Sequence, residues 1–362
     1  MTDPAALRSE FPVLERLSYL NAGTNGPIPR RATEAARDSL VQQTNEGRGG
    51  EPFFEAAMDA AEQLRARVAA LLGSQPGELA LTGSTTDGVN TVVSALGLGA
   101  GDEVLTSDEE HPGVLAPLAG LRDRAGVSVR VAPFASIASE VRSETRLVAV
   151  SHVSWITGRV VDCEALGEAG APVLLDGAQG LGAIPVDVRE LGCDFYAAAG
   201  QKWMCGPNGV GYLYVRGKCI PELPAPWPWY SSVTDGHHPL DSPLREDAAR
   251  FDMAVVAPHH SAWALAALDV LEEPGFEDGQ RRALSLAARL ADLLSERGLT
   301  LAPRGRSTLV SWEADDPAAQ SERLFAEGIV VRHLPESPWV RASVGAWTAE
   351  EELDRLVSLV GR

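Results

Sequence analysis

The chain has 362 residues, of which 45% are hydrophobic, enough for one large domain and a smaller one. Fifty acidic residues against 31 basic ones give a net charge of -19, which disfavours nucleic acid and anionic membranes as partners. The sequence has no basic-then-apolar leader and no run of apolar residues long enough to span a membrane, and its four cysteines lack metal-ligand spacing. We therefore expect a cytoplasmic protein without a metal site.

The first part of the chain predicts a short strand, a turn and two helices. The strand around Tyr19 breaks into the turn Asn21-Ala-Gly-Thr-Asn-Gly-Pro. Apolar residues then recur on one face over residues 31–43 and 54–72, which indicates two scaffold helices.

A hydroxyl-rich turn, Gly83-Ser84-Thr85-Thr86, follows a predicted strand at 79–82 and opens a helix. Free backbone N–H groups and the positive end of a helix dipole suit a phosphate. The same residue types also cap helices that bind no ligand. The later run Gly97, Gly99, Gly101 lacks the spacing of a dinucleotide-binding loop, which argues against NAD.

Three further strands are predicted at 103–106, 127–131 and 147–153, and two of them lead into conspicuous side chains. The first runs into Asp108-Glu-Glu-His111, and a histidine at such a place is commonly just exposed or hydrogen-bonded. The third is followed by Trp155, which either packs in the core or forms a pocket wall.

The stretch 173–215 carries the strongest chemical signal. An apolar run ends in Asp176, as expected of a buried strand that delivers a carboxylate at its end. A second strand, 195–198, runs into Gly200-Gln201-Lys202-Trp203, where a lysine can lose solvation and act as an amine nucleophile. The pair favours pyridoxal phosphate, which needs an amine for its Schiff base and a carboxylate for its ring nitrogen. Two unrelated strand ends in an ordinary α/β core are the alternative.

The C-terminal third predicts a loop excursion and then a compact two-layer domain. Residues 218–247 are rich in Pro, Trp, Tyr and His, which is typical of a surface loop or a subunit interface. Helices are expected from 258 and over 281–297, 318–327 and 349–360, with strands at 309–312, 329–332 and 340–344. Thr348 and Glu351 have the spacing of a capping box for the last helix.

These motifs, in this order and along almost the whole chain, resemble the class V branch of the pyridoxal-phosphate aminotransferase fold, which includes the cysteine desulfurases. The resemblance implies an α/β protein of fold type I. Residues 1–18 would be an N-terminal segment packing near the small domain, 19–250 the large cofactor-binding domain with a mixed, mostly parallel sheet, and 251–362 a smaller α+β domain. It also implies a homodimer whose active sites are shared between the two chains.

The resemblance also implies roles for individual residues. Lys202 would link covalently to the cofactor, Asp176 would pair with the pyridine nitrogen, Gln179 would contact the ring hydroxyl, and His111 would stack on the ring and relay protons. Further members of the implied cofactor set are Ser84, Thr85 and Thr86 for the phosphate, and Gln201. Arg341 would bind the α-carboxylate of an amino-acid substrate, with Asn21 and Trp155 beside it.

Departures from the desulfurase pattern indicate the reaction. The segment 333–339 contains no cysteine, whereas a desulfurase carries its sulfur-accepting cysteine there. Trp155 stands where desulfurases have an asparagine, and the run Ala254-Val-Val lacks the threonine that reaches the partner's phosphate. In these details the chain resembles the L-cysteine/L-cystine carbon-sulfur lyases. We expect β-elimination from an amino acid bound to the cofactor as a Schiff base, with a class V aminotransferase or an amino-acid epimerase as alternatives, and a non-catalytic binding protein as a third.

Overall fold

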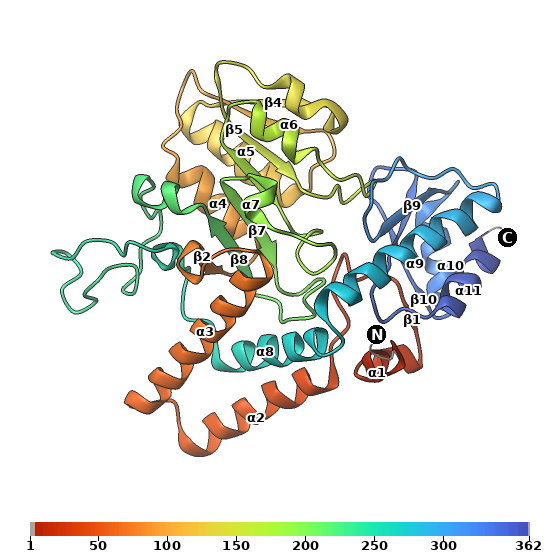
Figure 1. Ribbon diagram of the computed structural model, residues 1–362, viewed down its shortest axis with the longest axis horizontal. Helices are drawn as coiled ribbons and strands as arrows, with labels where there is room; N and C mark the ends of the chain where they lie inside the picture. The colour runs from red at the N-terminus through yellow and green to blue at the C-terminus, as the bar shows by residue number, and fades with distance from the viewer. Residues whose placement is uncertain (1–3, 361–362) are drawn as a thin grey trace.

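The computed structural model describes residues 4–360, and its larger part is built around a seven-stranded sheet of order β2-β8-β7-β6-β5-β3-β4 (Figure 1). The strands are β2 (Leu79–Thr82), β3 (Glu103–Ser107), β4 (Ser128–Ala132), β5 (Thr145–Ser151), β6 (Val173–Asp176), β7 (Phe195–Ala199) and β8 (Gly211–Val215). Only β8 runs against its neighbours, β2 and β7, so the other six strands point the same way. The mixed, mostly parallel sheet expected from the sequence is confirmed.

Helices cover both faces of this sheet, because its strands are apolar on both sides. In β5, Val148 and Val150 belong to one core cluster, while Leu147 and Ala149 belong to another on the opposite face. The first cluster includes residues of α3 (Glu51–Leu71), α6 (Cys163–Glu168), α7 (Val188–Leu191) and α8 (Pro258–Glu272). The second includes residues of α4 (Thr85–Ala95) and α5 (Pro112–Ala125).

The smaller domain is a three-stranded antiparallel sheet of order β11-β12-β9 covered by helices. Its strands are β9 (Leu309–Glu313), β11 (Arg332–His333) and β12 (Trp339–Ser343), and its helices are α9 (Phe276–Glu296), α10 (Pro317–Ala326) and α11 (Glu350–Val360). The prediction of a single strand at 329–332 is wrong. It is split into β10 (Ile329–Val330) and β11, because β10 pairs with the N-terminal β1 (Ser18–Tyr19) and β11 pairs with β12.

The N-terminal segment lies against the small domain. Arg8, in α1 (Pro4–Ser9), makes an ion pair of 2.8 Å with Glu352, and the Phe11 ring lies 5.0 Å from the Trp347 ring. Residues 1–3 of the predicted segment 1–18 lie outside the described residues. The predicted capping box of Thr348 and Glu351 is wrong, because Glu352 is the residue whose carboxylate accepts the Ala349 N–H at 2.8 Å.

Helix α8 packs against α2 (Arg30–Glu46) and α3, and its residues Ala264 and Leu268 belong to the core of the large domain. Apart from Leu20, the residues of the small-domain core begin with α9. We therefore propose a domain boundary near Gly275, between α8 and α9, instead of the predicted one after residue 250.

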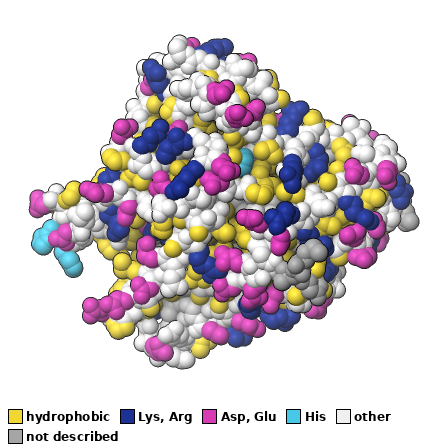
Figure 2. Space-filling view, in the orientation of Figure 1, with side chains coloured by type: hydrophobic (Ala, Val, Ile, Leu, Met, Phe, Trp, Pro, Cys, Tyr) yellow, Lys and Arg dark blue, Asp and Glu magenta, His cyan; other side chains and the backbone are white. Residues whose placement is uncertain are grey.

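The part of the chain before α8 also contains irregular structure. Short 3-10 turns lie at Pro12–Glu15, Pro76–Glu78, Phe134–Glu140, Gly217–Glu222 and Ala248–Phe251. The segment 223–247 between the last two projects away from the body on the left of Figure 1. Charged side chains of both signs are interspersed over the face drawn in Figure 2. Among the described residues, no helix combines the length and the apolar character needed to cross a membrane.

Candidate active site

The chemically interesting residues gather where the like-directed strands of the large sheet end. Asp176 ends β6, and the residues after β2, β3 and β7 include Ser84, His111 and Lys202. Loops at this edge of a parallel sheet commonly form the ligand site. Here they surround a cavity of about 300 Å³. Its lining residues are Gly23, Thr24, Asn25, Ser84, Thr85, Thr86, His111, Gly113, Trp155, Asp176, Ala178, Gln179, Ala199, Gln201, Lys202 and Arg332.

Lys202 and Asp176 form the reactive part of this cavity. Burial lowers the pKa of the Lys202 amine to about 8, against the opposing effect of Asp176. The positive charges of Arg341 and Arg332 lower it further. Burial raises the pKa of Asp176, while the Lys202 charge and a 2.8 Å hydrogen bond from the Ala178 N–H oppose this shift. An appreciable fraction of the Lys202 amine is therefore neutral near pH 7 and can attack a carbonyl.

The N-terminus of α4 borders the same cavity. The Ser84 side chain caps the helix by accepting the Asp87 N–H at 3.1 Å, so the capping role considered from the sequence is realised. The Thr85 hydroxyl is buried and has no hydrogen-bond partner, and Thr86 also faces the cavity. A helix start with an unpaired hydroxyl is a suitable place for a phosphate.

His111 and Trp155 lie against each other on another wall. Their rings are 5.0 Å apart in an edge-on arrangement of 82°. Burial lowers the pKa of His111 to about 4, and the Lys202, Arg332 and Arg341 charges add to this shift. The His111 Nδ1 accepts the Gly113 N–H at 3.0 Å, so the neutral imidazole carries its proton on Nε2.

Arg332 and Arg341 are direct cross-strand partners in β11 and β12. Arg332 lines the cavity, where its guanidinium lies 5.6 Å from the Trp155 ring centroid and donates to the Thr24 hydroxyl at 3.1 Å. Arg341 is wholly buried behind Gly23 and donates from Nη1 to the Trp155 carbonyl at 2.6 Å, while its Nε and Nη2 have no partner. Neither arginine makes an ion pair among the described residues, so this like-charge pair suits an anion.

The remaining predicted residues are placed as follows. The Gln179 amide donates to the Gly23 carbonyl at 2.7 Å and accepts the Trp203 indole N–H at 3.0 Å. The Gln201 Oε1 is buried without a partner beside the cavity. Asn21 lies behind the wall, where its side-chain oxygen accepts the Thr24 hydroxyl at 2.8 Å, so its substrate role stays a prediction.

Sequence reasoning missed Arg332, Thr24 and Asn25. Arg332 could have been noticed because it starts the segment 332–341, whose two ends are both arginines. A β-hairpin would bring such residues opposite each other. For Thr24 and Asn25 the turn composition was the only signal.

The cavity fits pyridoxal phosphate. It offers an amine for the aldehyde, a carboxylate for the ring nitrogen and a helix N-terminus for the phosphate, which are the groups that this cofactor requires. Three buried polar atoms of lining residues lack protein partners: the Thr85 hydroxyl, the Trp155 indole nitrogen and the Gln201 amide oxygen. Such atoms are normally satisfied by a ligand or water.

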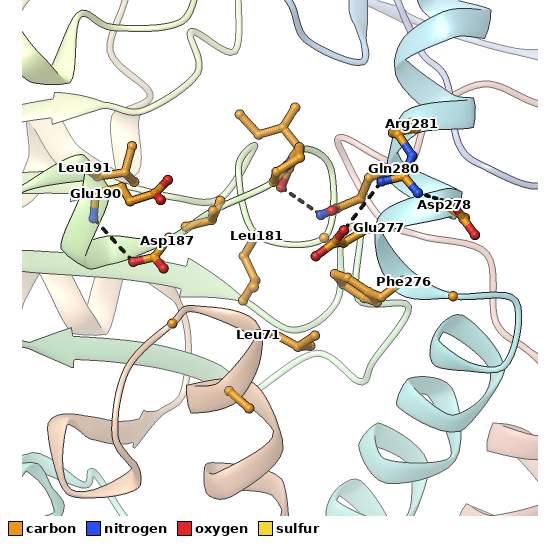
Figure 3. Close-up of a pocket in the computed structure, with 17 residues that line it drawn as sticks. Leu71, Leu181, Asp187, Glu190, Leu191, Phe276, Glu277, Asp278, Gln280 and Arg281 are labelled. Carbon is orange, nitrogen blue, oxygen red and sulfur yellow. Dashed lines mark hydrogen bonds and ion pairs between the residues drawn. The ribbon is translucent and has the colours of Figure 1, made fainter.

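A larger hollow lies elsewhere in the molecule. Figure 3 shows this groove of about 740 Å³, with Leu71, Asp187 and Glu190 on the large-domain side and Phe276 and Glu277 at the start of α9. It contains neither Lys202 nor Asp176. Size alone therefore does not identify the reactive site, and we assign the chemistry to the smaller cavity.

Comparisons with known proteins agree with this geometry. The profile of the family described as aminotransferase class-V matches residues 18–356. A probable cysteine desulfurase of Halalkalibacterium halodurans is 29% identical over 97% of this chain and 95% of its own length. A cysteine desulfurase of Yersinia pestis is 30% identical over 97% of this chain and 96% of its own length.

Solved structures extend the likeness to three dimensions. A lysine-to-alanine mutant of C-DES, with glycine covalently linked to its PLP cofactor, has a TM-score of 0.93 at 28% identity, covering 100% of this chain and 99% of that one. The cystine C-S lyase C-DES in complex with its reaction product cysteine persulfide has a TM-score of 0.91 at 28% identity, covering 97% of this chain and 99% of that one.

Proposed function

This chain is a pyridoxal-phosphate enzyme of the class V aminotransferase family, and on that premise we propose that it is a carbon-sulfur lyase. Its substrate would be a cysteine- or cystine-type amino acid, cleaved by β-elimination. The observation that carries this proposal is a cavity that combines Lys202 and Asp176 with Arg332, with Arg341 behind its wall, but has no cysteine in its lining. Its resemblance to a structure described as a cystine C-S lyase supports the same reaction.

Each of these residues of the cavity has a separate role in β-elimination. Pyridoxal phosphate, when bound, supplies the electron sink that makes the substrate's α-proton removable. Lys202 would hold the cofactor, and as a free amine with a lowered pKa it would remove this proton as a general base. Asp176 would keep the ring nitrogen protonated. His111 is neutral at pH 7 and lies at the cavity wall, where it can stack on the ring and pass a proton.

The arginine pair would hold the substrate's carboxylate. Arg341 has two free donors on one edge of its guanidinium, the arrangement that binds a carboxylate in a bidentate manner. Since this edge lies behind Gly23, the turn at 23–25 must move slightly for the carboxylate to reach it. Arg332 already borders the cavity and would add a second positive charge.

The sulfur chemistry requires no thiol of the protein. The C–S bond breaks, sulfur leaves with its electron pair on the substrate's own fragment, and the three-carbon remainder is hydrolysed to pyruvate and ammonia. All four cysteines are free, and burial raises the pKa of each, so their thiols are protonated and weakly nucleophilic at pH 7. Free thiols also agree with the cytoplasmic location that we propose, which cell fractionation would test.

A product assay on the purified, cofactor-loaded protein tests the proposal. It would be incubated separately with cystine, cysteine, a cysteine sulfoxide and alanine. Pyruvate formed from a sulfur amino acid without any keto acid supports the lyase. A new amino acid formed only when a keto acid is added would instead support the aminotransferase, and loss of optical activity without pyruvate would support the epimerase.

We further propose that the enzyme is a homodimer. Helices α2 and α3 expose Leu40, Val41, Phe54 and Met58, each about half accessible, and α2 has only Ala32 fully buried. These consecutive helices form the lower edge of the molecule in Figure 1. Apolar side chains repeated along two helices are typical of a subunit interface.

Light scattering of the double variant Leu40→Glu/Phe54→Glu tests this interface. The wild type should have twice the mass of the chain, and the variant should be monomeric. Phe325→Glu is the matched control, because Phe325 is at least as exposed but lies on α10 of the small domain. A monomeric wild type would overturn the dimer.

A further inference from the structure

Gln179 lies at a junction of three parts of the site. Its side chain lines the cavity together with Asp176 and Lys202. The amide nitrogen donates to the Gly23 carbonyl of the N-terminal turn at 2.7 Å, and the amide oxygen accepts the indole N–H of Trp203 at 3.0 Å. Gln179 and Trp203 are both almost fully buried, at 4% and 3% exposure.

The two partners fix which way the amide points. An indole N–H can only donate and a carbonyl oxygen can only accept, so Trp203 must face the amide oxygen and Gly23 must face the NH₂ group. With its oxygen turned to Trp203, the amide has one N–H left uncommitted. Gln179 can therefore offer this N–H to its cavity neighbour as a donor.

The orientation of the Gln179 amide matters for the bound cofactor. The ring hydroxyl of pyridoxal phosphate is negatively charged in its reactive form, and it lies beside the carbon to which Lys202 would be linked. A donor draws charge from that oxygen and weakens its hold on the proton at the Lys202 linkage. An amide turned the other way would present its oxygen to the anionic ring oxygen, and the two would repel each other.

We infer that Trp203 is a positioning residue whose indole N–H holds the Gln179 amide with its donor toward the cofactor. If this N–H is removed, the amide oxygen is left buried without a partner. Only the Gly23 carbonyl would then favour the orientation with the donor toward the cofactor, and the cost of the buried, unpaired oxygen weakens that preference. The inference concerns cofactor binding and does not depend on the lyase reaction, so it can be tested even if no lyase activity is found.

The test is a pH titration of the visible absorption of the cofactor-loaded protein, together with the cofactor's dissociation constant. Gln179→Leu should raise the pH midpoint of the absorption change by about one unit, the size expected for one hydrogen bond to a charged acceptor. Trp203→Phe, which keeps an aromatic ring but lacks the donor, should raise it by about half as much. Cofactor affinity should fall several-fold in both variants.

The chain offers a matched control in Trp263. Its indole N–H donates to the Cys205 carbonyl at 2.9 Å, on the same loop but away from Gln179. Trp263→Phe should leave the midpoint at the wild-type value, which separates the proposed role from a general loosening of the loop.

The double variant Trp203→Phe/Gln179→Leu decides whether Trp203 acts through Gln179. If it does, the double variant has the midpoint of Gln179→Leu alone. The inference is overturned if Trp203→Phe leaves the midpoint unchanged while Gln179→Leu moves it, or if the Trp203 effect persists in the Gln179→Leu background. Circular dichroism verifies that each variant is folded, and Gln179→Glu, which keeps an acceptor for Trp203 but has no amide donor, should move the midpoint in the same direction.

Discussion

Replacing Arg341 by Met should weaken amino-acid binding without destabilising the ligand-free protein. Arg341 is wholly buried, and only its Nη1 has a partner, the Trp155 carbonyl. Burial, together with the charge of Arg332, lowers the pKa of Arg341 from 12.5 to about 9, so it is still protonated at pH 7. This shift corresponds to at most about 5 kcal/mol of destabilisation by the buried charge.

The substitution removes that penalty but also leaves the Trp155 carbonyl unpaired, which costs about 1 to 3 kcal/mol. The free energy of unfolding of the ligand-free variant should therefore be unchanged or higher by up to about 4 kcal/mol. Binding should respond in the opposite sense. A bidentate, charge-assisted pair contributes about 2 to 4 kcal/mol, so the dissociation constant for an amino acid should rise about 30- to 1000-fold.

Two measurements check this prediction: urea unfolding of the cofactor-free protein at pH 7, and a spectral titration of the loaded protein with alanine. Arg304→Met is the control, because Arg304 is also partly buried in the small domain but donates to the carbonyls of Ser307 and Leu309. It should lose stability and keep normal binding. The reasoning is refuted if Arg341→Met loses more than about 2 kcal/mol of stability while it binds alanine normally, since Arg341 would then be a structural residue.

Lys202→Ala should lose both the cofactor's visible absorption and turnover, whereas Lys218→Ala should retain them, because the only other lysine is exposed and pairs with Asp194; a coloured, active Lys202 variant would contradict the assignment. Cys205→Ala, and replacement of all four cysteines together, should leave pyruvate formation from cystine largely intact, and loss of activity with an unchanged spectrum would indicate sulfur transfer to the protein. Burial raises the pKa of Glu110 to about 7 despite hydrogen bonds from Ser107 and Ser151, so the stability it contributes is present below pH 4.5 and is lost as the pH rises toward 7. Glu110→Gln should therefore gain up to about 3 kcal/mol relative to the wild type between pH 5 and pH 8, as measured by urea unfolding, and a pH-independent difference would show that Glu110 does not titrate in this range.

Local sequence patterns were sufficient to predict the strands and the helix that carry the reactive groups. Apolar runs that end in Asp176, or that lead into Lys202 and His111, are strands whose ends meet at one edge of the sheet. The hydroxyl-rich turn at Ser84 opens α4 as expected. These predictions hold because each depends on a short apolar run or on a cap a few residues away, and a parallel sheet then brings the strand ends together whatever the loops do.

Contacts between distant segments determined the rest. The segment 329–332 reads as one strand, yet it is divided because its first half finds β1, more than 300 residues earlier, and its second half finds β12. The residue that caps α11 is Glu352 and not the predicted Glu351, and the Glu352 carboxylate also pairs with Arg8. A pattern of neighbours cannot predict such pairings, since the competing partners lie far away in the chain.

The same limit applies within the active site. The sequence by itself indicated the Lys202 and Asp176 chemistry, because the residue types and the strand ends that carry them are local features. Only the tertiary structure placed Arg332 opposite Arg341 and joined Gln179 to both Gly23 and Trp203. Whether an arginine lacks a counter-ion, and in which orientation a side-chain amide is held, depends on every group that folding brings within hydrogen-bond distance. That set of groups is fixed by packing between segments.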